Sequence, residues 1–261
     1  MNGRMVRLSF HTNGSNATGS LNTKSVSQSS INRIGVIQLS TMAFLLMIVL
    51  MMAPGCTKTD STYKNASVPS VSFNGDAYAY LESQKGVFDS LLKALARVPG
   101  LIDSLRSSQV TFFAPANRSF EIALFNANQA RLDSVPQMPP LDINTIDVKL
   151  LDSTLCKYIV RDKIVSSDLF NTLSDGRDVA TIKYSYVMNM KMLFTNASGY
   201  VAGGPTLINF SDRNNSIFTR YWVTTKTSTS DIVTSNAVVN LLDVGHDFGF
   251  GNTFIRSVNR R

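Results

Sequence analysis

The sequence predicts an α+β domain, with helices in the first half of the main part of the chain and strands in the second half. Three observations support this prediction. Between Phe88 and Ile159 apolar residues recur at helical spacing, and one short apolar stretch that begins at Thr111 interrupts them. Beyond Lys163 apolar and polar residues alternate, which is typical of strands with one buried face.

The first 56 residues have the composition of a targeting leader. They contain four basic residues and no acidic one, and every residue from Met42 to Ala53 is apolar. This run is too short to cross a bilayer as a helix, which needs about 20 residues, but it has the length of a signal-peptide core. It ends in Ala53-Pro54-Gly55-Cys56, which resembles the lipobox of bacterial lipoproteins. The resemblance implies that the leader, residues 1–56, ends in a lipid-bearing Cys56 that anchors the protein in the cell envelope.

Two features depart from the lipobox pattern and leave an alternative open. The apolar run starts late, and Ala53-Pro54 stands where such signals more often carry leucine and a small residue. The alternative is a buried apolar helix with an incidental cysteine. We favour the signal, because the run has no polar face. Since Thr57, and not an aspartate, follows the cysteine, we expect the outer membrane of a Gram-negative bacterium as the location.

Without the leader the net charge is small. Of the 25 basic residues four precede Cys56, which leaves 21 against 18 acidic ones. The basic residues are scattered and form no stripe interleaved with aromatics, so we expect no nucleic-acid partner. Cys156 is then the remaining cysteine. Its place beside an apolar helix stripe predicts a packing residue and not a nucleophile.

The main part of the chain opens with a tether and two helices. Residues 57–74 are polar and aperiodic, which predicts a flexible tether, and a single domain follows over residues 75–261. Apolar spacing predicts two short helices, one from Phe88 to Leu95 and one from Leu101 to Leu105. The Pro99-Gly100 dipeptide separates them, because neither residue favours a helix interior.

A strand-to-helix junction comes next. The apolar stretch that starts at Thr111 predicts a short strand, which Pro115 ends because it has no N–H to continue the ladder. We expect the side chain of Asn117 to cap the helix that follows, and we expect Phe113 and Phe120 to be buried on either side of the junction. Spacing then predicts another helix over residues 147–159.

Two alternating runs predict strands in the second half. The first runs from Ile182 to Met192, and the second runs from Ile217 to Thr225 and includes Trp222. The thioethers of Met188, Met190 and Met192 could ligate a soft metal such as Cu(I), but we favour core packing, because no histidine or thiolate accompanies them. Trp222 could stack on a sugar if exposed, and we favour a half-buried position.

Two segments, taken together, resemble the signature segments of the fasciclin domain. The first is Thr111-Phe112-Phe113-Ala114-Pro115-Ala116-Asn117-Arg118-Ser119-Phe120, and the second runs from Asp231 to Asp243 with Asn236 at a turn or bulge. The resemblance covers about residues 83–244. It implies helices packed around a wedge of two β-sheets, and a noncatalytic role such as adhesion. The positions that match the motif, all structural, are Thr111, Phe113, Ala114, Pro115, Asn117, Phe120, Asp231, Asn236 and Asp243.

The chain departs from the family pattern at positions linked with adhesion. Animal members often carry a Tyr-His pair after the central helix, where this chain has Lys157-Tyr158. The late segment normally shows Asn-Gly and then a histidine, where this chain has Asn236-Ala237 and Asn240. The resemblance therefore implies the scaffold, and not a contact made through those histidines.

Few groups suit catalysis. After the leader there are one histidine, His246, and two glutamates. This inventory builds neither a histidine triad nor a multi-histidine metal site, so we expect no enzyme, no metal and no cofactor. The aspartate pairs Asp175 with Asp178 and Asp231 with Asp243 keep one alternative open, a polysaccharide-handling accessory protein or a glycoside hydrolase.

The main functional prediction is a lipid-anchored binding or adhesion domain. Its partner is expected to be another protein or a surface polysaccharide. Loops vary while a scaffold holds them in place, so we expect the binding surface on the connector at residues 136–146 and the turn at residues 199–205.

Overall fold

A computed structural model describes residues 71–260 apart from 171, 173, 197, 198, 200 and 202. The chain divides into two compact units, residues 1–59 and 60–261, and every described residue belongs to the second. The predicted leader, Cys56 and residues 57–70 of the predicted tether lie outside the described residues. Within the described part of the chain, no helix has the length and apolar character that crossing a bilayer requires.

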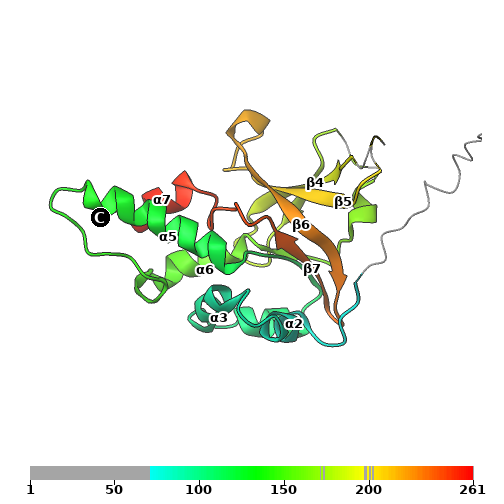
Figure 1. Cartoon of the computed structure of the whole chain (residues 1–261), viewed down its shortest axis with the longest axis horizontal. Helices are drawn as coiled ribbons and strands as arrows, with labels where there is room; N and C mark the ends of the chain where they lie inside the picture. Colours follow the sequence, from blue (N-terminus) through cyan, green and yellow to red (C-terminus); the bar gives the residue numbers. More distant parts are fainter. Residues whose placement is uncertain are drawn as a thin grey trace, which may run out of the picture. The chain divides into compact units, whose positions relative to one another are not determined.

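The described residues form a mixed α+β fold, as predicted (Figure 1). Six short α-helices are described: α2 (Ala77–Ser83), α3 (Asp89–Ala96), α4 (Leu101–Ser107), α5 (Asn117–Leu132), α6 (Val148–Cys156) and α7 (Asn252–Val258). Seven strands accompany them: β1 (Val110–Ala114), β2 (Ile159–Arg161), β3 (Arg177–Ala180), β4 (Val187–Phe194), β5 (Thr206–Asp212), β6 (Val223–Val233) and β7 (Ala237–Leu242).

The strands follow the order β2-β1-β7-β6-β5-β4-β3. The β1 and β7 strands run parallel, and the other neighbours are antiparallel. The long β6 strand pairs with β5 through its first residues and with β7 through its last, with register shifts between Thr227 and Ile232. Irregularities of this kind bend a strand, so β6 is shared by two half-sheets. A bridge between Val160 and Thr181 joins the two outer strands, which matches the predicted wedge of two sheets.

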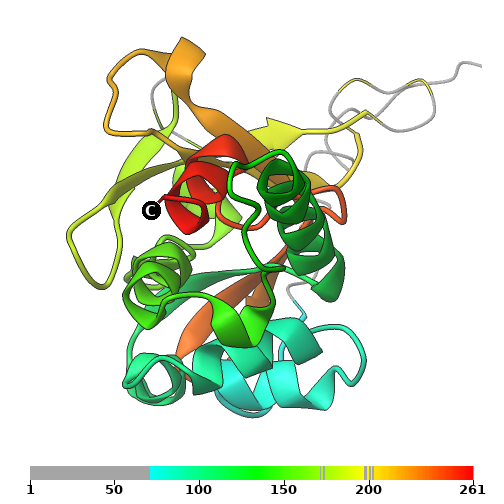
Figure 2. The same ribbon diagram turned by 90° about the vertical axis from the view of Figure 1, so that its left-hand side faces the viewer.

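The helices pack in two groups around the strands (Figure 2). Helices α2, α3 and α4 lie together beside β7, while α5, α6 and α7 form the second group. Between them lies one core that contains fully buried aromatic rings from the first signature segment, from β5 and from the segment before α7, including Phe113, Phe120, Phe210, Phe248 and Phe250.

Several predicted boundaries need correction. The strand predicted from Ile182 starts only at Val187, because Tyr184 and Ser185 adopt positive φ angles of 62° and 47° in a turn. The strand predicted from Ile217 starts only at Val223, after the 3-10 helix η3 (Thr219–Tyr221). In both runs the alternation of apolar and polar residues extends by chance into the loop before the strand.

Other differences concern the ends of helices and of the domain. The helix predicted over residues 147–159 ends at Cys156, and Ile159 already belongs to β2. Helix α2 was not predicted, since its seven residues are too few to show a clear period. Pairing with the sheet begins inside the predicted tether, because Ser72 bridges Val233.

Candidate functional site

The two phenylalanines of the first signature segment are buried in the core, as predicted. Phe113 stacks on Phe210 with ring centroids 3.8 Å apart, and Phe120 stacks on Phe248 at 4.2 Å. Ala114 is equally buried, and Pro115 ends β1 as expected. These contacts tie the strand-to-helix junction to β5 and to the segment before α7.

Asn117 caps a helix, but not the one predicted. It is the first residue of α5, whose N-cap, Ala116, makes no side-chain hydrogen bond. The Asn117 side chain instead accepts a hydrogen bond from the backbone N–H of Ser90 at 2.8 Å and donates one to the carbonyl of Gly86 at 2.9 Å. It therefore satisfies a free N–H at the start of α3, whose own N-cap residue makes no side-chain bond.

Asn236 lies in the turn between β6 and β7, as predicted, and is buried. Its oxygen accepts from the N–H of Ala77, the first residue of α2, at 3.1 Å. Its amide nitrogen donates to the carbonyls of Leu105 and Ser108, at 2.9 and 3.0 Å, where α4 ends. One side chain thus links a hairpin to the ends of two helices.

Further motif residues also hold neighbouring segments. Thr111 Oγ1 donates to the carbonyl of Asp162 and accepts from the N–H of Ile164, both at 2.8 Å. Asp231 accepts from the backbone N–H of Ser166 at 2.8 Å and also from the Ser166 hydroxyl. Asp243 accepts from the N–H of Gly245 at 2.9 Å. Thr111 and Asp231 thus bond to segments that are distant in sequence, whereas Asp243 bonds within its own turn.

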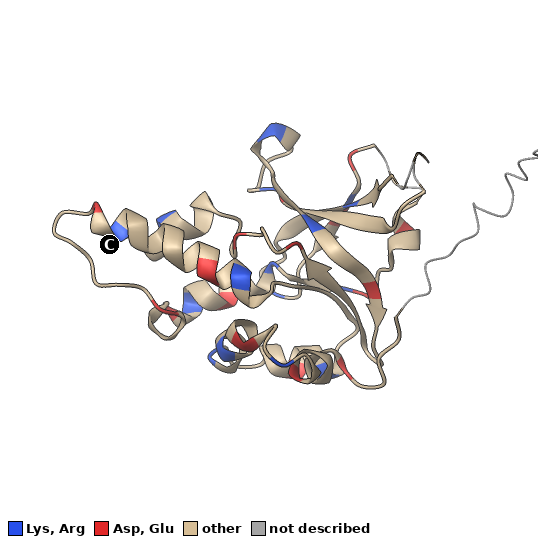
Figure 3. Cartoon of the chain, viewed as in Figure 1, with Lys and Arg blue, Asp and Glu red and all other residues tan. Residues whose placement is uncertain are grey.

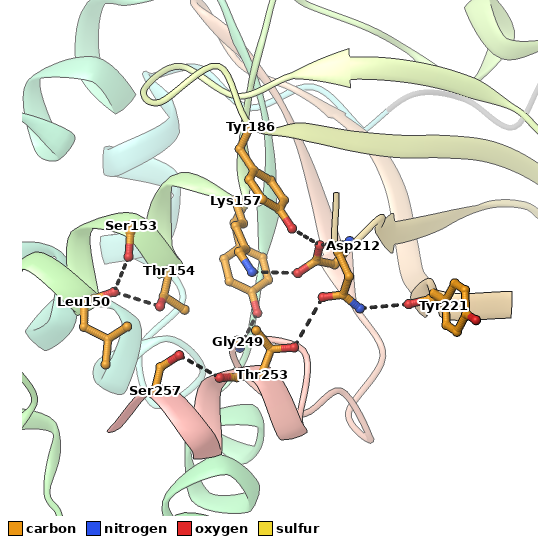
Figure 4. Close-up of polar contacts among 12 residues, drawn as sticks. Leu150, Ser153, Thr154, Lys157, Tyr186, Asp212, Tyr221, Gly249, Thr253 and Ser257 are labelled. Carbon is orange, nitrogen blue, oxygen red and sulfur yellow. Dashed lines mark hydrogen bonds and ion pairs between the residues drawn. The ribbon is translucent and has the colours of Figure 1, made fainter. Parts of the chain in front are cut away.

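Lys157 and Asp212 form an ion pair below the surface (Figure 4). The Asp212 side chain is fully buried, and its Oδ2 lies 2.6 Å from Lys157 Nζ. Its Oδ1 accepts from the Tyr186 hydroxyl at 2.5 Å and from the N–H of Asn214 at 2.8 Å. Burial and the bond to Asp212 raise the pKa of Tyr186 above its usual value, so it stays a donor. A buried charge is tolerable here because every oxygen of Asp212 has a partner.

Tyr158 and His246 form a second buried contact. The Tyr158 hydroxyl accepts from the N–H of Gly249 at 2.7 Å, which leaves its own proton to donate to His246 Nε2 at 2.8 Å. His246 then carries its proton on Nδ1 and is neutral. Burial lowers the pKa of His246 to about 3 and raises that of Tyr158. A neutral, buried imidazole of this kind serves packing.

A groove of about 540 Å³ lies between the start of β3, the middle of β4 and the segment that follows β5. Charged or polar side chains that line it are Thr172, Asp175, Arg177, Asp178, Asn189 and Arg213, and its apolar lining includes Ile217 and Trp222. Gly176 forms part of the wall at a φ of 89°, where a Cβ would stand 2.5 Å from the Met190 carbonyl oxygen. This close approach requires glycine and sets the position of Asp175 beside the sheet.

The groove continues into an exposed segment, residues 216–223, which we call the aromatic arm. Drawn in orange, it projects beyond β5 and β6 (Figures 1 and 2). Ile217, Phe218 and Tyr221 are exposed, and the Arg220 guanidinium stacks on both aromatic rings at 5.3 and 4.7 Å from their centroids. Asn214 holds the base of the arm by donating to the carbonyl of Tyr221 at 2.8 Å (Figure 4). Sequence reasoning assigned this segment to a strand and so missed it.

Of the two loops predicted to bind a partner, the structure describes one completely. The connector at residues 136–146 is fastened to the helices: Arg97 donates to the carbonyls of Ile143 and Ile146, and Arg131 donates to that of Pro139. The side chains of Ile143 and Ile146 are buried. The turn at residues 199–205 includes residues 200 and 202, which the structure does not describe.

The remaining candidate groups are engaged in structural contacts. Cys156 is buried, and burial together with the nearby Asp152 raises the pKa of its thiol to about 12. The thiol therefore stays protonated, which suits a packing residue and not a nucleophile. Met188 and Met190 are buried in the core. Trp222 is half-buried, as expected. Within the described ranges, no group of three or more His, Cys, Asp or Glu side chains is placed to hold a metal ion.

Positive and negative side chains are dispersed over helices and strands in the described part of the chain (Figure 3). The fold is thus an α+β scaffold whose motif residues hold its own segments together and whose groove and aromatic arm face outward. The family model of the fasciclin domain matches residues 86–244, more than half of the chain. This chain belongs to the fasciclin domain family, whose members are cell-adhesion-type domains.

Comparison with solved structures finds similarity to a FAS1 domain pair from the insect cell adhesion molecule fasciclin I. The TM-score is 0.41, with 16% sequence identity over 62% of this chain. The chain spans 45% of the length of that domain pair. No significant match was found among curated proteins.

Proposed function

We propose that this chain is a lipid-anchored binding protein of the cell envelope, and that its fasciclin domain attaches to a macromolecule outside the membrane without chemical turnover. The observation that carries the proposal is the fasciclin domain itself, a cell-adhesion-type domain, over residues 86–244. The structure adds support, since the residues of the family motif are occupied in holding the scaffold together, as Asn117 and Asn236 are.

The anchor in this proposal is Cys56, and the compartment is the outer membrane of a Gram-negative bacterium. The support is the uninterrupted apolar run that ends in Ala53-Pro54-Gly55-Cys56. A lipid at that position places residues 57–70 between the membrane and the first strand pairing at Ser72. Fourteen residues span at most about 50 Å when extended, so the domain works close to the membrane.

The anchor is tested by substituting each cysteine in cells that make the full chain. Cys56→Ser should leave an unprocessed precursor that no longer fractionates with the outer membrane. Cys156→Ser, the matched control, should be processed and anchored like the natural chain, because Cys156 lies inside the domain. Mass spectrometry that finds residues 1–55 attached and Cys56 unmodified in the natural chain would contradict the proposal.

A second candidate function, glycoside hydrolysis, is favoured by one observation: Asp175 and Asp178 line the same groove. A glycosidase needs one carboxyl group as general acid and a second as base or nucleophile. Asp178 is poorly suited to either role, because Asn189 donates to one of its oxygens at 3.0 Å and Arg213 pairs with the other. We therefore prefer binding. Turnover of a polysaccharide that disappears in Asp175→Asn would reverse this preference.

A further inference from the structure

We propose that the groove beside Trp222 binds a neutral oligosaccharide, so that the partner of this domain is a surface glycan. This inference rests on the proposed binding function and names the class of ligand. It is carried by the chemistry of the groove: a fixed indole ring, polar groups held in place by one another, and charges that cancel.

The polar groups of the groove are held in one arrangement. Asp178 accepts from Asn189 Nδ2 at 3.0 Å and pairs with the Arg213 guanidinium, which also donates to the carbonyl of Ser216 at 3.3 Å. Asn189 is itself buried in β4. These contacts fix amide, carboxylate and guanidinium groups beside an open space before any ligand arrives. A preorganised site loses less conformational entropy when it binds, so it binds more tightly for the same contacts.

Trp222 is the aromatic surface of the groove. Its indole N–H donates to the carbonyl of Ser216 at 2.9 Å, and the Arg213 guanidinium lies 5.2 Å from the ring centroid. Both contacts hold the ring in position. Part of the ring surface stays exposed, since Trp222 is only half-buried. Ile217, 75% exposed, extends the apolar lining. A sugar ring has an apolar C–H face that packs on such a surface and hydroxyl groups that suit the polar wall.

The charges in the groove favour a neutral ligand. Among the described residues that line it, Arg177 and Arg213 are balanced by Asp175 and Asp178. A phosphate or sulfate group is usually held by an excess of positive charge, with arginine forks free to bind it on two sides. Here Arg213 already pairs with Asp178. The volume of about 540 Å³ lies within the usual range for small-ligand sites, which suits a short stretch of a glycan chain.

The chain contains one tryptophan, so its fluorescence reports on this groove alone. We would titrate the purified full chain in detergent with cellohexaose, mannohexaose and xylohexaose, and with heparin as the acidic comparison. The expected result is a saturable change in tryptophan emission with at least one neutral hexaose, together with heat of binding in calorimetry that changes little when salt is raised. Heparin alone producing the change would overturn the proposal.

Variants locate the site. Trp222→Ala should weaken binding of the hexaose about tenfold or more in calorimetry, and Ile217→Ala and Arg177→Ala should weaken it several-fold. Arg220→Ala is the matched control, since Arg220 belongs to the same segment but does not line the groove, and it should bind like the natural chain. Ile217 and Arg177 are exposed, so their substitution tests the site even if Trp222→Ala fails to fold.

The outcomes separate this inference from the function on which it rests. Equal affinity in the natural chain and in the Ile217→Ala and Arg177→Ala variants would overturn the assignment to this groove. No response to any neutral hexaose would overturn the saccharide class, while crosslinking of the anchored chain to a protein on intact cells would leave the binding function standing. New reducing ends in the reaction mixture would overturn binding without turnover.

Discussion

Phe120 shows at the scale of one residue how the first signature segment stabilises the fold. Its ring is 1% exposed and stacks on Phe248, which in turn stacks on Tyr158 with centroids 5.6 Å apart. The stack joins α5, the residue before β2 and the segment before α7. Phe248 lies more than 40 residues from Phe120 in the sequence, so the contact between these two rings also closes a long loop of the chain.

Phe120→Ala is therefore expected to lower the free energy of unfolding by about 3–5 kcal/mol, since it removes a core aromatic ring and leaves a cavity. Urea unfolding followed by circular dichroism measures the loss. Phe125→Ala on the same helix is the control, because Phe125 is 63% exposed and should change stability by less than about 0.5 kcal/mol. A loss below about 1 kcal/mol for Phe120→Ala would remove this ring from the account of core stability.

At the scale of elements, the short helices depend on side chains from distant segments. Helix α3 receives its cap from Asn117 in α5, and α2 and α4 meet at Asn236 in the β6–β7 turn. Seven- and eight-residue helices are marginal alone, because few of their backbone groups are paired within the helix. The two asparagines of the family motif supply partners at the helix ends.

Asn236→Ala is expected to lower the free energy of unfolding by about 3 kcal/mol, because it leaves the buried carbonyl of Leu105 and the N–H of Ala77 without this partner. Hydrogen exchange should show earlier opening of α2 and α4 than of α6. Asn144→Ala is the matched control, since Asn144 is exposed and bonds only within its own turn to Asp142. Equal exchange in α2 and α6 would contradict the proposed link.

Elements with a clear hydrophobic period could be predicted from the sequence, whereas those set by tertiary contacts could not. The spacing of Phe88, Leu91 and Leu95 identified α3, because one face of that helix packs on the core. Tyr184 and Ile217 continued an alternating pattern but lie in loops, since alternation carries no information about positive φ angles or sheet ends. Asn117 was predicted to cap α5, the helix that follows it, and this was wrong: its side chain bonds to the start of α3, which meets it only in the folded chain.

The same limit applies to the candidate site. Asp175 and Asp178 were considered as a pair from their spacing, and the structure brings them into one groove. Arg213 and Trp222, which complete the groove, follow 35 or more residues later and arrive through the pairing of β4 with β5 and of β5 with β6. Trp222 was singled out because it is the one tryptophan of the chain, and this was the signal that the sequence offered for the groove.

At the scale of the whole molecule, buried titratable groups connect stability to pH. His246, which lies in the segment between β7 and α7, is the relevant base. It is buried and contacts Tyr158 and Phe250, and Asp243 and Asp247 are its acidic neighbours in sequence. Burial also raises the pKa of Asp247, whose charge is therefore disfavoured in the folded chain. The two groups act in opposite directions, because acidification penalises a neutral histidine and relieves a buried carboxylate.

For His246 the direction follows from its folded pKa of about 3, which lies below the ordinary value of 6.5. Between these values the unfolded chain binds a proton that the folded chain excludes, so stability rises with pH across this window. The contribution is complete above pH 6.5 and is lost as the pH falls, by about 1.4 kcal/mol for each pH unit.

His246→Gln keeps an oxygen that can accept from Tyr158 but removes the titration. Urea unfolding of both chains from pH 7 to pH 4 should therefore show the natural chain losing stability relative to the variant, steadily below pH 6.5. Parallel curves across this range would mean that His246 takes up its proton without leaving the fold, and that the buried contact with Tyr158 is not what holds it neutral.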